Sequence, residues 1–319
     1  MCSEKKESSN FGLLDIVKQC DNFPYPEETV EIQKFNTTPL ILNDTKIGLL
    51  LPSVIQALRS YNEKHESPSP FVIKEDLVTF SPHVNTFEKR TKAIEQLLNS
   101  WRTEKTFSAL KGWRDELYPV YGDPSGPSNM AFVIERAATP LFGVLTFGVH
   151  LTGFVKTKGH YRIWVAKRSK TKPTWPGYLD NTVAGGIPYN LSITESIIKE
   201  AMEEANLPRE IAKDSVPAGA ITYFTVTERG LQPEAQYIYD LELPIDVVPK
   251  PFDDEVECFY LWDISKVIDH IKAGEFKPNC ALDFLIRHSI ITPDKEPAYL
   301  DILYRLHRRH EFPGPSFQS

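Results

Sequence analysis

The sequence contains little cysteine, and its cysteines form no motif. Four of the 319 residues are cysteine, at Cys2, Cys20, Cys258 and Cys280, and no two have the Cys-x-x-Cys spacing. Their placement argues against a zinc knuckle or a disulfide framework and favours a reducing compartment. The first residues, Met1 to Glu7, lack the apolar segment of a secretory signal, and no apolar run reaches the ~20 residues that span a bilayer. We therefore expect a cytoplasmic protein without a membrane partner.

Positive charge is also scarce. The chain carries 36 Lys and Arg residues against 43 Asp and Glu residues, a formal net charge of −7. This balance argues against nucleic acid as a partner, because binding to a phosphate backbone needs a cationic surface. The sequence contains no internal repeat, and its length is enough for two domains with separate cores.

Three carboxylates on one expected helix are the most informative feature that is present. Glu200, Glu203 and Glu204 have helical offsets of three and four residues, which place them within an arc of roughly 100°. Such crowding costs about 0.2–0.5 kcal/mol for each like-charge pair. A bound Mg²⁺ or Mn²⁺ would reverse that cost, because hard dications prefer carboxylate oxygens. The alternative is the solvated acidic face of a surface helix.

The segment before these carboxylates predicts where the helix begins. Ser192 and Glu195 have the spacing of a capping box. In this motif the hydroxyl of the first residue accepts a hydrogen bond from the backbone amide three residues later, and the Glu side chain accepts one from the amide of the first residue. Upstream, Gly185 and Gly186 permit a close approach of the backbone, and a helix N-terminus suits a bound anion. The combination favours a binding cleft over a plain surface helix.

At these positions the sequence resembles the Nudix box. Gly185 matches the opening glycine of the box, and Glu200 matches the glutamate of its Arg-Glu pair. Glu203 and Glu204 match the following Glu-Glu pair, and Leu207 matches the last apolar position. The resemblance therefore covers the carboxylates that hold metal in this family.

Three positions depart from the box. Lys199 replaces the arginine, Leu191 stands where an early glutamate belongs, and Asn206 replaces a late glycine. Lysine can pair with a carboxylate but lacks the guanidinium fork, and asparagine tolerates a left-handed helix end. These departures leave the metal-binding carboxylates in place.

Further segments extend the resemblance over nearly the whole chain. Together they look like the thiamine-pyrophosphokinase-related Nudix hydrolases of fungi and plants. The matching segments are residues 112–118, 167–181, 183–188, 237–241, 253–257, 276–281 and 284–288.

The resemblance implies an α/β fold, with a Nudix α/β/α sandwich over residues 137–319. A smaller α+β domain over residues 1–136 would precede it and help select the substrate. The implied activity is Mg²⁺- or Mn²⁺-dependent hydrolysis of thiamine diphosphate, or of its oxidised derivatives, to the monophosphate and phosphate, as in metabolite damage repair. Two alternatives stay open: hydrolysis of a nucleotide-type diphosphate, and a catalytically weak protein that binds thiamine diphosphate. Both a monomer and a homodimer are compatible with the sequence.

The resemblance also assigns roles to individual residues. Glu200, Glu203 and Glu204 would bind metal, and Glu204 would take part in catalysis, with Glu203 or Glu255 as the general base. The predicted substrate-binding residues are Arg168, Lys172, Trp175, Gly185 and Gly186. Arginine can hold a phosphate with two hydrogen bonds and lysine adds a point charge.

Aromatic residues of the N-terminal half could contact a substrate ring. Phe80, Trp101, Trp113 and Tyr118 offer flat surfaces to a cationic thiazolium, although each could equally belong to a core.

Two related activities have sequence requirements that the chain does not meet. Isopentenyl-diphosphate isomerase shares the Arg168-Ser169 and Pro176-Gly177 approach to the box but places a catalytic cysteine where this chain has residues 183–185. A true thiamine pyrophosphokinase needs an ATP site, and the sequence has no glycine-rich phosphate loop.

Hydrophobic periodicity predicts the remaining elements. The expected helices are residues 11–20, 47–61, 92–101, 264–272, 281–288 and 297–310. The expected strands are residues 71–73, 77–80, 142–154, 161–166, 221–227, 237–243 and 257–262. We expect Gly148 to break its strand and the tail from Glu311 to Ser319 to fray.

Overall fold

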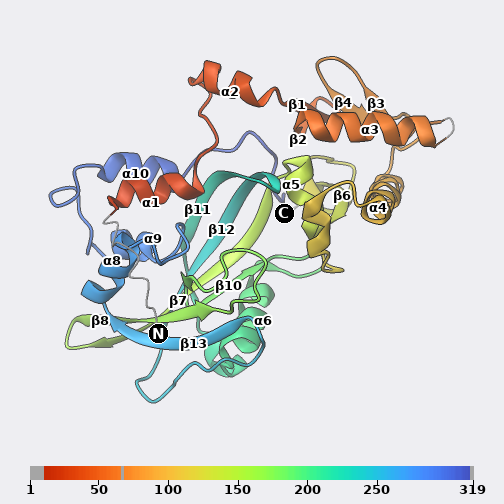
Figure 1. Ribbon diagram of the computed structural model, residues 1–319. Helices are drawn as coiled ribbons and strands as arrows, with labels where there is room; N and C mark the ends of the chain where they lie inside the picture. The colour runs from red at the N-terminus through yellow and green to blue at the C-terminus, as the bar shows by residue number, and fades with distance from the viewer. Residues whose placement is uncertain (1–10, 66–67, 317–319) are drawn as a thin grey trace, which may run out of the picture.

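A seven-stranded sheet forms the centre of the computed structural model, which describes residues 11–65 and 68–316 (Figure 1). Cys2 and the segment from Met1 to Glu7 lie outside these residues. The strand order is β11-β12-β7-β8-β13, and β10 also pairs with β7 and β9 with β8. The strands are β7 (Thr146–Thr157), β8 (His160–Arg168), β9 (Leu179–Asp180), β10 (Val183–Gly186), β11 (Val216–Thr227), β12 (Gly230–Glu242) and β13 (Val256–Asp263).

Strand β7 runs without a break through Gly148, so the prediction of an interruption there is wrong. Gly148 pairs with Gly186 of β10 and with Gln236 of β12. A Cβ atom at Gly148 would come within 2.8 Å of the Gly185 carbonyl oxygen and would overlap the Gln236 side chain. Glycine is needed here because two neighbouring strands approach closely, and not because the strand ends.

Helices cover both faces of this sheet, which confirms the predicted α/β/α sandwich. On one side of the sheet, α6 and α7 pack against a core that includes Val149, Leu151 and Ala201. The other side holds α1 and the three last helices around a core that includes Val165, Ile238 and Phe284. Figure 1 shows these two groups on opposite sides of the strands. Their bounds are α1 (Leu13–Cys20), α6 (Ile193–Ala205), α7 (Arg209–Ala212), α8 (Ile264–Lys272), α9 (Leu282–Arg287) and α10 (Tyr299–Leu306).

The first half has an α+β core of its own, which includes Leu40, Leu97, Phe132 and Val144. It contains a four-stranded sheet with the order β2-β1-β4-β3 and a two-stranded sheet of β5 and β6. The domain boundary at residues 136/137 stays a prediction. The elements are α2 (Thr29–Phe35), β1 (Thr38–Leu42), β2 (Thr45–Leu50), α3 (Pro52–Lys64), β3 (Phe71–Ile73), β4 (Val78–Phe80), α4 (Phe87–Glu104), η1 (Ser108–Gly112), β5 (Leu117–Tyr121), η2 (Pro127–Asn129), β6 (Met130–Glu135), η3 (Arg136–Ala138) and α5 (Thr139–Phe142).

The helix predicted from Ile47 begins later than expected. Ile47 and Leu50 lie in strand β2, which pairs with β1, and helix α3 starts at Pro52. Proline suits the first helical turn because that turn has no acceptor for its amide. The buried apolar run before Pro52 is therefore a strand.

The two ends of the described chain meet. Helix α1 buries Ile16 and Val17 in the same core as Ile302 of α10. Next to it, the fully buried Asp21 accepts a hydrogen bond from Arg308 at 2.8 Å. The first helix is thus part of the core of the second half.

The predicted fraying of the tail is wrong for residues 311–316. Glu311 forms an ion pair with Lys46 at 2.7 Å, and the Phe312 ring packs edge-on against Phe224. Residues 317–319 lie outside the described structure.

No helix within the described residues combines the length and the apolar content that crossing a membrane requires.

We expect the buried ion pair between Arg90 and Asp123 to be important for stability. Both side chains are 2% exposed, and Arg90 also donates to the Ala131 carbonyl at 2.7 Å. Asp123→Ala leaves a buried guanidinium unpaired, which should lower the free energy of unfolding by about 3–5 kcal/mol. Urea unfolding measures the change.

The control for this variant is Glu31→Ala, which breaks an ion pair with Lys34 that is exposed to solvent. Exposed pairs contribute about 0–1 kcal/mol, so this variant should unfold near the wild-type midpoint. Equal midpoints for the two variants would contradict the assignment.

Candidate active site

Helix α6 carries the predicted carboxylates and begins at the predicted cap. The Ser192 side chain accepts a hydrogen bond from the Glu195 amide at 3.1 Å, and Asn206 ends the helix with a φ of 51°. Ala201 and Ala205 on the opposite face are fully buried. The helix is therefore held by its apolar face, and its carboxylate face lies against strand β10.

Gly185 lets the helix approach this strand closely. A Cβ atom at this position would come within 2.7 Å of Glu200 Oε1 and would overlap the Glu200 carboxyl carbon. No residue other than glycine leaves room for the Glu200 carboxylate here.

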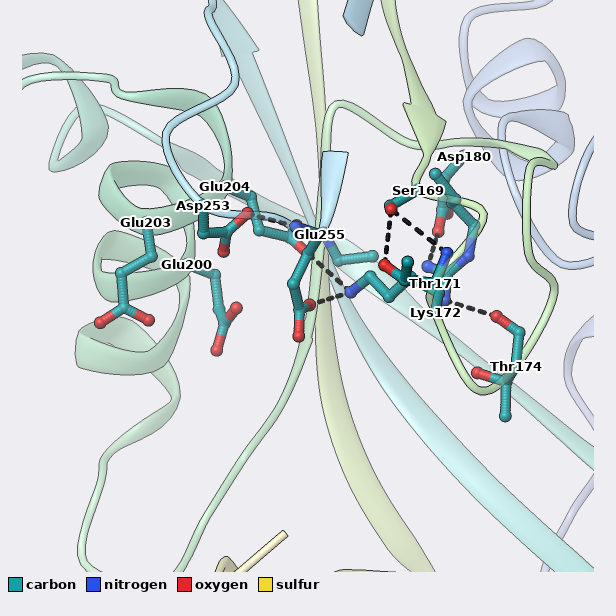
Figure 2. Close-up of polar contacts among 12 residues, drawn as sticks. Ser169, Thr171, Lys172, Thr174, Asp180, Glu200, Glu203, Glu204, Asp253 and Glu255 are labelled. Atoms are coloured by element: carbon teal, nitrogen blue, oxygen red, sulfur yellow. Dashed lines mark hydrogen bonds and ion pairs between the residues drawn. The ribbon is translucent and has the colours of Figure 1, made fainter. Parts of the chain in front are cut away.

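Glu204 is the most enclosed of the three carboxylates, at 4% exposure. Its Oε2 accepts a hydrogen bond from the Ala184 amide at 3.0 Å, and its Oε1 lies 3.3 Å from Lys172 Nζ. Lys172 also forms an ion pair with Glu255, so its ammonium bridges the helix and the loop before β13, as Figure 2 shows. Burial raises the pKa of Glu204, although Lys172 stabilises the charged form.

Glu200 and Glu203 have different surroundings. Burial and the nearby Glu204 charge raise the pKa of Glu200 to about 7. Glu203 is half exposed and forms an ion pair with Lys199 at 2.6 Å. Glu200 and Glu204 thus share a concentration of negative charge, whereas Glu203 lies nearer to solvent.

The donor set fits a hard divalent cation in chemistry and charge. In the described part of the chain, no group of three or more His, Cys, Asp or Glu side chains could hold a metal ion as it stands. The site nevertheless holds a concentration of negative charge. The Lys172 ammonium lies between Glu204 and Glu255, and burial and the Glu204 charge disfavour the ionised form of Glu200. Carboxylate oxygens are the donors that Mg²⁺ and Mn²⁺ prefer.

Arg168 orders the loop that carries Lys172. Its guanidinium donates to Asp180 Oδ2 at 2.7 Å, to the Thr174 carbonyl at 2.8 Å and to the Trp175 carbonyl at 3.1 Å. The fork predicted for a phosphate is therefore used within the protein. The Trp175 ring packs edge-on against Tyr178 with a centroid distance of 5.0 Å.

A cavity of about 340 Å³ lies between the first half and the central sheet. Strand β10 forms one wall with Gly185 and Gly186, beside the loop residues Lys172 and Trp175. Tyr118 of β5 packs directly on strand β10, because a Cβ atom at Gly186 would overlap the Tyr118 hydroxyl. The cavity thus reaches the strand that lies against the carboxylate helix.

Of the four aromatic residues proposed for ring contact, Tyr118 lines this cavity. Phe80 and Trp101 are buried in the core of the first half, and Trp113 packs against that core. The sequence alone could not separate these cases, because all four are aromatic residues in mixed polar surroundings.

A polar wall that the sequence analysis missed lies in the same cavity. The Tyr223 hydroxyl donates to Glu234 at 2.5 Å and accepts from Gln236 and Asn279. The His150 side chain is 2% exposed, and its Nδ1 has no hydrogen-bond partner among the described residues. No motif marks these residues, because they converge from strands and a loop that lie far apart in the sequence.

Comparisons with known proteins show which family the chain is similar to. A family model described as a domain of unknown function (DUF4743) matches residues 12–146. The chain is 35% identical over 315 residues to Nudix hydrolase 20, chloroplastic, of Arabidopsis thaliana, which covers 96% of this chain and 80% of that protein. It is 34% identical to Nudix hydrolase 24, chloroplastic, of the same plant, over 92% of this chain and 77% of that protein. An uncharacterized Saccharomyces cerevisiae protein is 37% identical, over 98% of this chain and 95% of that protein.

Solved structures show a weaker similarity over part of the chain. One is the NUDIX domain of Shewanella oneidensis NrtR complexed with ADP ribose, with 12% identity and a TM-score of 0.33 over 40% of this chain and 78% of that chain. Another is a C. elegans Ap4A hydrolase, with 14% identity and a TM-score of 0.33 over 49% of this chain and 98% of that chain.

The α/β/α sandwich carries a carboxylate helix packed on a glycine strand, and the two Arabidopsis thaliana relatives show that the chain belongs to the Nudix hydrolase family. It is accordingly a Nudix-type pyrophosphatase, which confirms the predicted family and reaction class. The thiamine-related subfamily and the roles of single residues stay predictions.

We expect Gly185→Ala to separate folding from activity. The added methyl group displaces the Glu200 carboxylate, so turnover should fall by at least about tenfold, a loss of about 1.4 kcal/mol in transition-state stabilisation. Steady-state kinetics at saturating Mg²⁺, together with a melting curve, measures both effects.

Gly112→Ala is the matched control, because a Cβ atom there meets nothing within 4 Å. It should keep wild-type turnover. Wild-type turnover in Gly185→Ala would contradict the role of the close approach.

We expect His150 to make the stability depend on pH. Burial lowers the pKa of His150 to about 3, below the ordinary value of about 6.5. The unfolded state therefore binds more protons below pH ~6.5, and stability falls with the pH in that range. Between pH 8 and pH 5.5 the loss should be about 1.4 kcal/mol larger in the wild type than in His150→Gln, measured by urea unfolding. The same pH dependence in both proteins would contradict the prediction.

Proposed function

We propose that the protein hydrolyses the diphosphate of thiamine diphosphate, or of its oxidised derivatives, to the monophosphate and inorganic phosphate. The reaction would depend on Mg²⁺ or Mn²⁺, and cytoplasmic repair of damaged cofactor would be its setting. The observation that carries the proposal is a single cavity. Strand β10, next to the carboxylate helix, and the polar wall around Glu234 both line it.

The polar wall suits a charged heterocycle. Glu234 provides a negative charge opposite a cationic ring, while Gln236, Asn279 and the neutral His150 provide hydrogen-bonding groups at fixed positions. Tyr118 offers an aromatic face to such a ring. The cavity is therefore complementary to a molecule that is cationic at its ring and anionic at its diphosphate.

The carboxylates have separate roles in this proposal. Glu200, Glu203 and Glu204 would hold the divalent ion, which neutralises charge on the diphosphate and lowers the pKa of bound water. Lys172 adds a positive charge at the same wall and forms an ion pair with Glu204. Gly185 and Gly186 make room at the cavity wall for the Glu200 carboxylate and the Tyr118 hydroxyl, and Trp175 lines the loop side of the cavity.

Glu255 is better placed than Glu203 to act as the general base. It lies beside Lys172 in the loop before β13, and its nearest oxygen is 4.0 Å from Arg114 of the opposite wall. Glu203 is engaged by Lys199 on the outer side of the helix. Glu255 would take a proton from water as the water oxygen forms a bond to phosphorus, and the P–O–P bond would break to release the monophosphate.

A substrate panel tests the proposal. Thiamine diphosphate, an oxidised derivative and ADP-ribose are each incubated with the full-length protein and Mg²⁺, and the products are identified by mass. We expect the thiamine compounds to have the highest kcat/KM. A preference of tenfold or more for the nucleotide-type diphosphate would refute the proposed substrate, and binding of a thiamine compound without phosphate release would indicate a binding protein.

Glu204→Gln supplies the mechanistic control within this panel. It keeps the side-chain size but removes the buried charge, so phosphate release should fall by about 100-fold or more while the protein stays folded. Glu210→Gln, on the exposed surface of α7, should keep wild-type activity. Equal activity of the two variants would contradict the assignment of Glu204.

A further inference from the structure

Three arginines from separate segments line one side of the cavity. Arg114 precedes β5, Arg136 begins η3 after β6, and Arg229 lies in the turn between β11 and β12. Altogether, six Lys or Arg side chains line the cavity, against the two carboxylates Glu228 and Glu234. The cavity therefore has a cationic side although the whole chain is acidic.

The backbone fixes the first two arginines relative to each other. The buried Glu135 carboxylate accepts hydrogen bonds from the amide of Arg114 at 2.9 Å and from the amide of Ala137 at 3.2 Å. The Arg136 amide in turn donates to the Glu116 carbonyl at 2.8 Å. These bonds join the segments before β5 and after β6 into one rigid corner.

The third arginine, Arg229, lies beside the segment of Arg136 because the next residue, Gly230, packs closely against Pro140. Gly230 follows Arg229 and has a φ of 131°, which favours glycine. A Cβ atom there would come within 2.7 Å of the Pro140 carbonyl carbon, four residues after Arg136. The β11–β12 turn thus packs against helix α5, which directly follows η3, and Arg229 therefore lies on the same side of the cavity as Arg136.

The positive charges of the three arginines are only partly neutralised. Arg136 donates to Glu116 at 2.8 Å, the nearest carboxylate oxygen to Arg114 is that of Glu255 at 4.0 Å, and Arg229 forms no ion pair within residues 11–65 and 68–316. Burial lowers the pKa of Arg229, and the charges of Arg114 and Arg136 lower it further. The guanidinium groups are therefore close enough to repel one another, and a bound anion would remove that repulsion.

The cationic side adjoins the carboxylate helix. The Arg136 guanidinium lies 5.3 Å from the centroid of the Tyr118 ring, whose hydroxyl packs on Gly186. The Glu200 charge contributes to raising the pKa of Arg136, which places the two groups within electrostatic reach. An anion at the arginines would therefore lie next to the proposed metal-binding residues.

We propose that Arg114, Arg136 and Arg229 form a phosphate-binding subsite for the diphosphate of the substrate. The N-terminal half then supplies two of the three guanidinium groups, so the segment matched by DUF4743 completes the active site of the Nudix half. Arginine suits this role because its planar fork can give two hydrogen bonds to one phosphate group. The proposal rests on the proposed function for the reaction, while binding of the anion can be tested independently.

The test compares Arg229→Gln and Arg114→Gln with the wild type in the full-length protein. Calorimetric titration with inorganic pyrophosphate and with inorganic phosphate gives Kd, and hydrolysis of thiamine diphosphate gives KM. Each variant should weaken pyrophosphate binding and raise KM by about 10- to 100-fold, as expected for a lost hydrogen bond between charged groups. Arg229 gives the clearest test, because in the described part of the chain it has no ion-pair partner that its replacement would leave unpaired.

Arg209→Gln is the control, because Arg209 pairs with Glu195 on the surface of the Nudix half and does not line the cavity. It should keep the wild-type Kd and KM. Unchanged pyrophosphate binding in both cavity variants would overturn the proposal. Weakened phosphate binding with an unchanged KM would mean that the arginines bind free phosphate but not the substrate. That result would also overturn the proposed subsite.

The two proposals fail separately. If thiamine diphosphate is not hydrolysed but the cavity variants still weaken pyrophosphate binding, the substrate assignment is wrong and the subsite stands. If thiamine diphosphate is hydrolysed with the same KM in all variants, the subsite is wrong and the substrate assignment stands.

Discussion

The site depends on the close approach of helix α6 to strand β10 at Gly185. Because this residue has no side chain, the Glu200 carboxylate packs directly over the strand, and Glu204 four residues later reaches the Ala184 amide. The approach confines two carboxylates to one small space, and their repulsion is only partly offset by Lys199 beside Glu200 and Lys172 beside Glu204. Negative charge held in this way is what makes the site receptive to a cation.

Two structural devices keep that arrangement in place. Arg168 binds the loop carbonyls of Thr174 and Trp175 as well as Asp180, and this fixes the loop from which Lys172 reaches the carboxylates. The first half closes the cavity from the other side, with Tyr118 packed on Gly186. The active site is therefore a product of both halves, although the carboxylate helix belongs to the second.

Sequence patterns predicted the parts of the fold that depend on local signals. The capping residue Ser192, the apolar face of α6 and most strands of the central sheet follow from spacing and cap chemistry. The strand at Ile47 was missed because a buried apolar run before a proline looks the same in a helix and in a strand. The sequence predicts Arg168 as a phosphate ligand, whereas the structure shows that its guanidinium donates hydrogen bonds within the protein. Two of the acceptors are backbone carbonyls, which no sequence pattern indicates. The proximity of Arg229 to Arg114 and Arg136, and the polar wall, depend on long-range packing, which no local sequence pattern indicates.

The packing of α1 and α10 in one core affects when the chain can fold during its synthesis. Helix α1 is synthesised before α10, and the surface that buries Ile16 and Val17 is complete only about 280 residues later. At about 5–20 residues per second, translation leaves this apolar stripe without its partner for roughly 15–55 s. The core of the second half is thus completed only after α10 has been synthesised, and until then the apolar face of α1 lacks part of its packing.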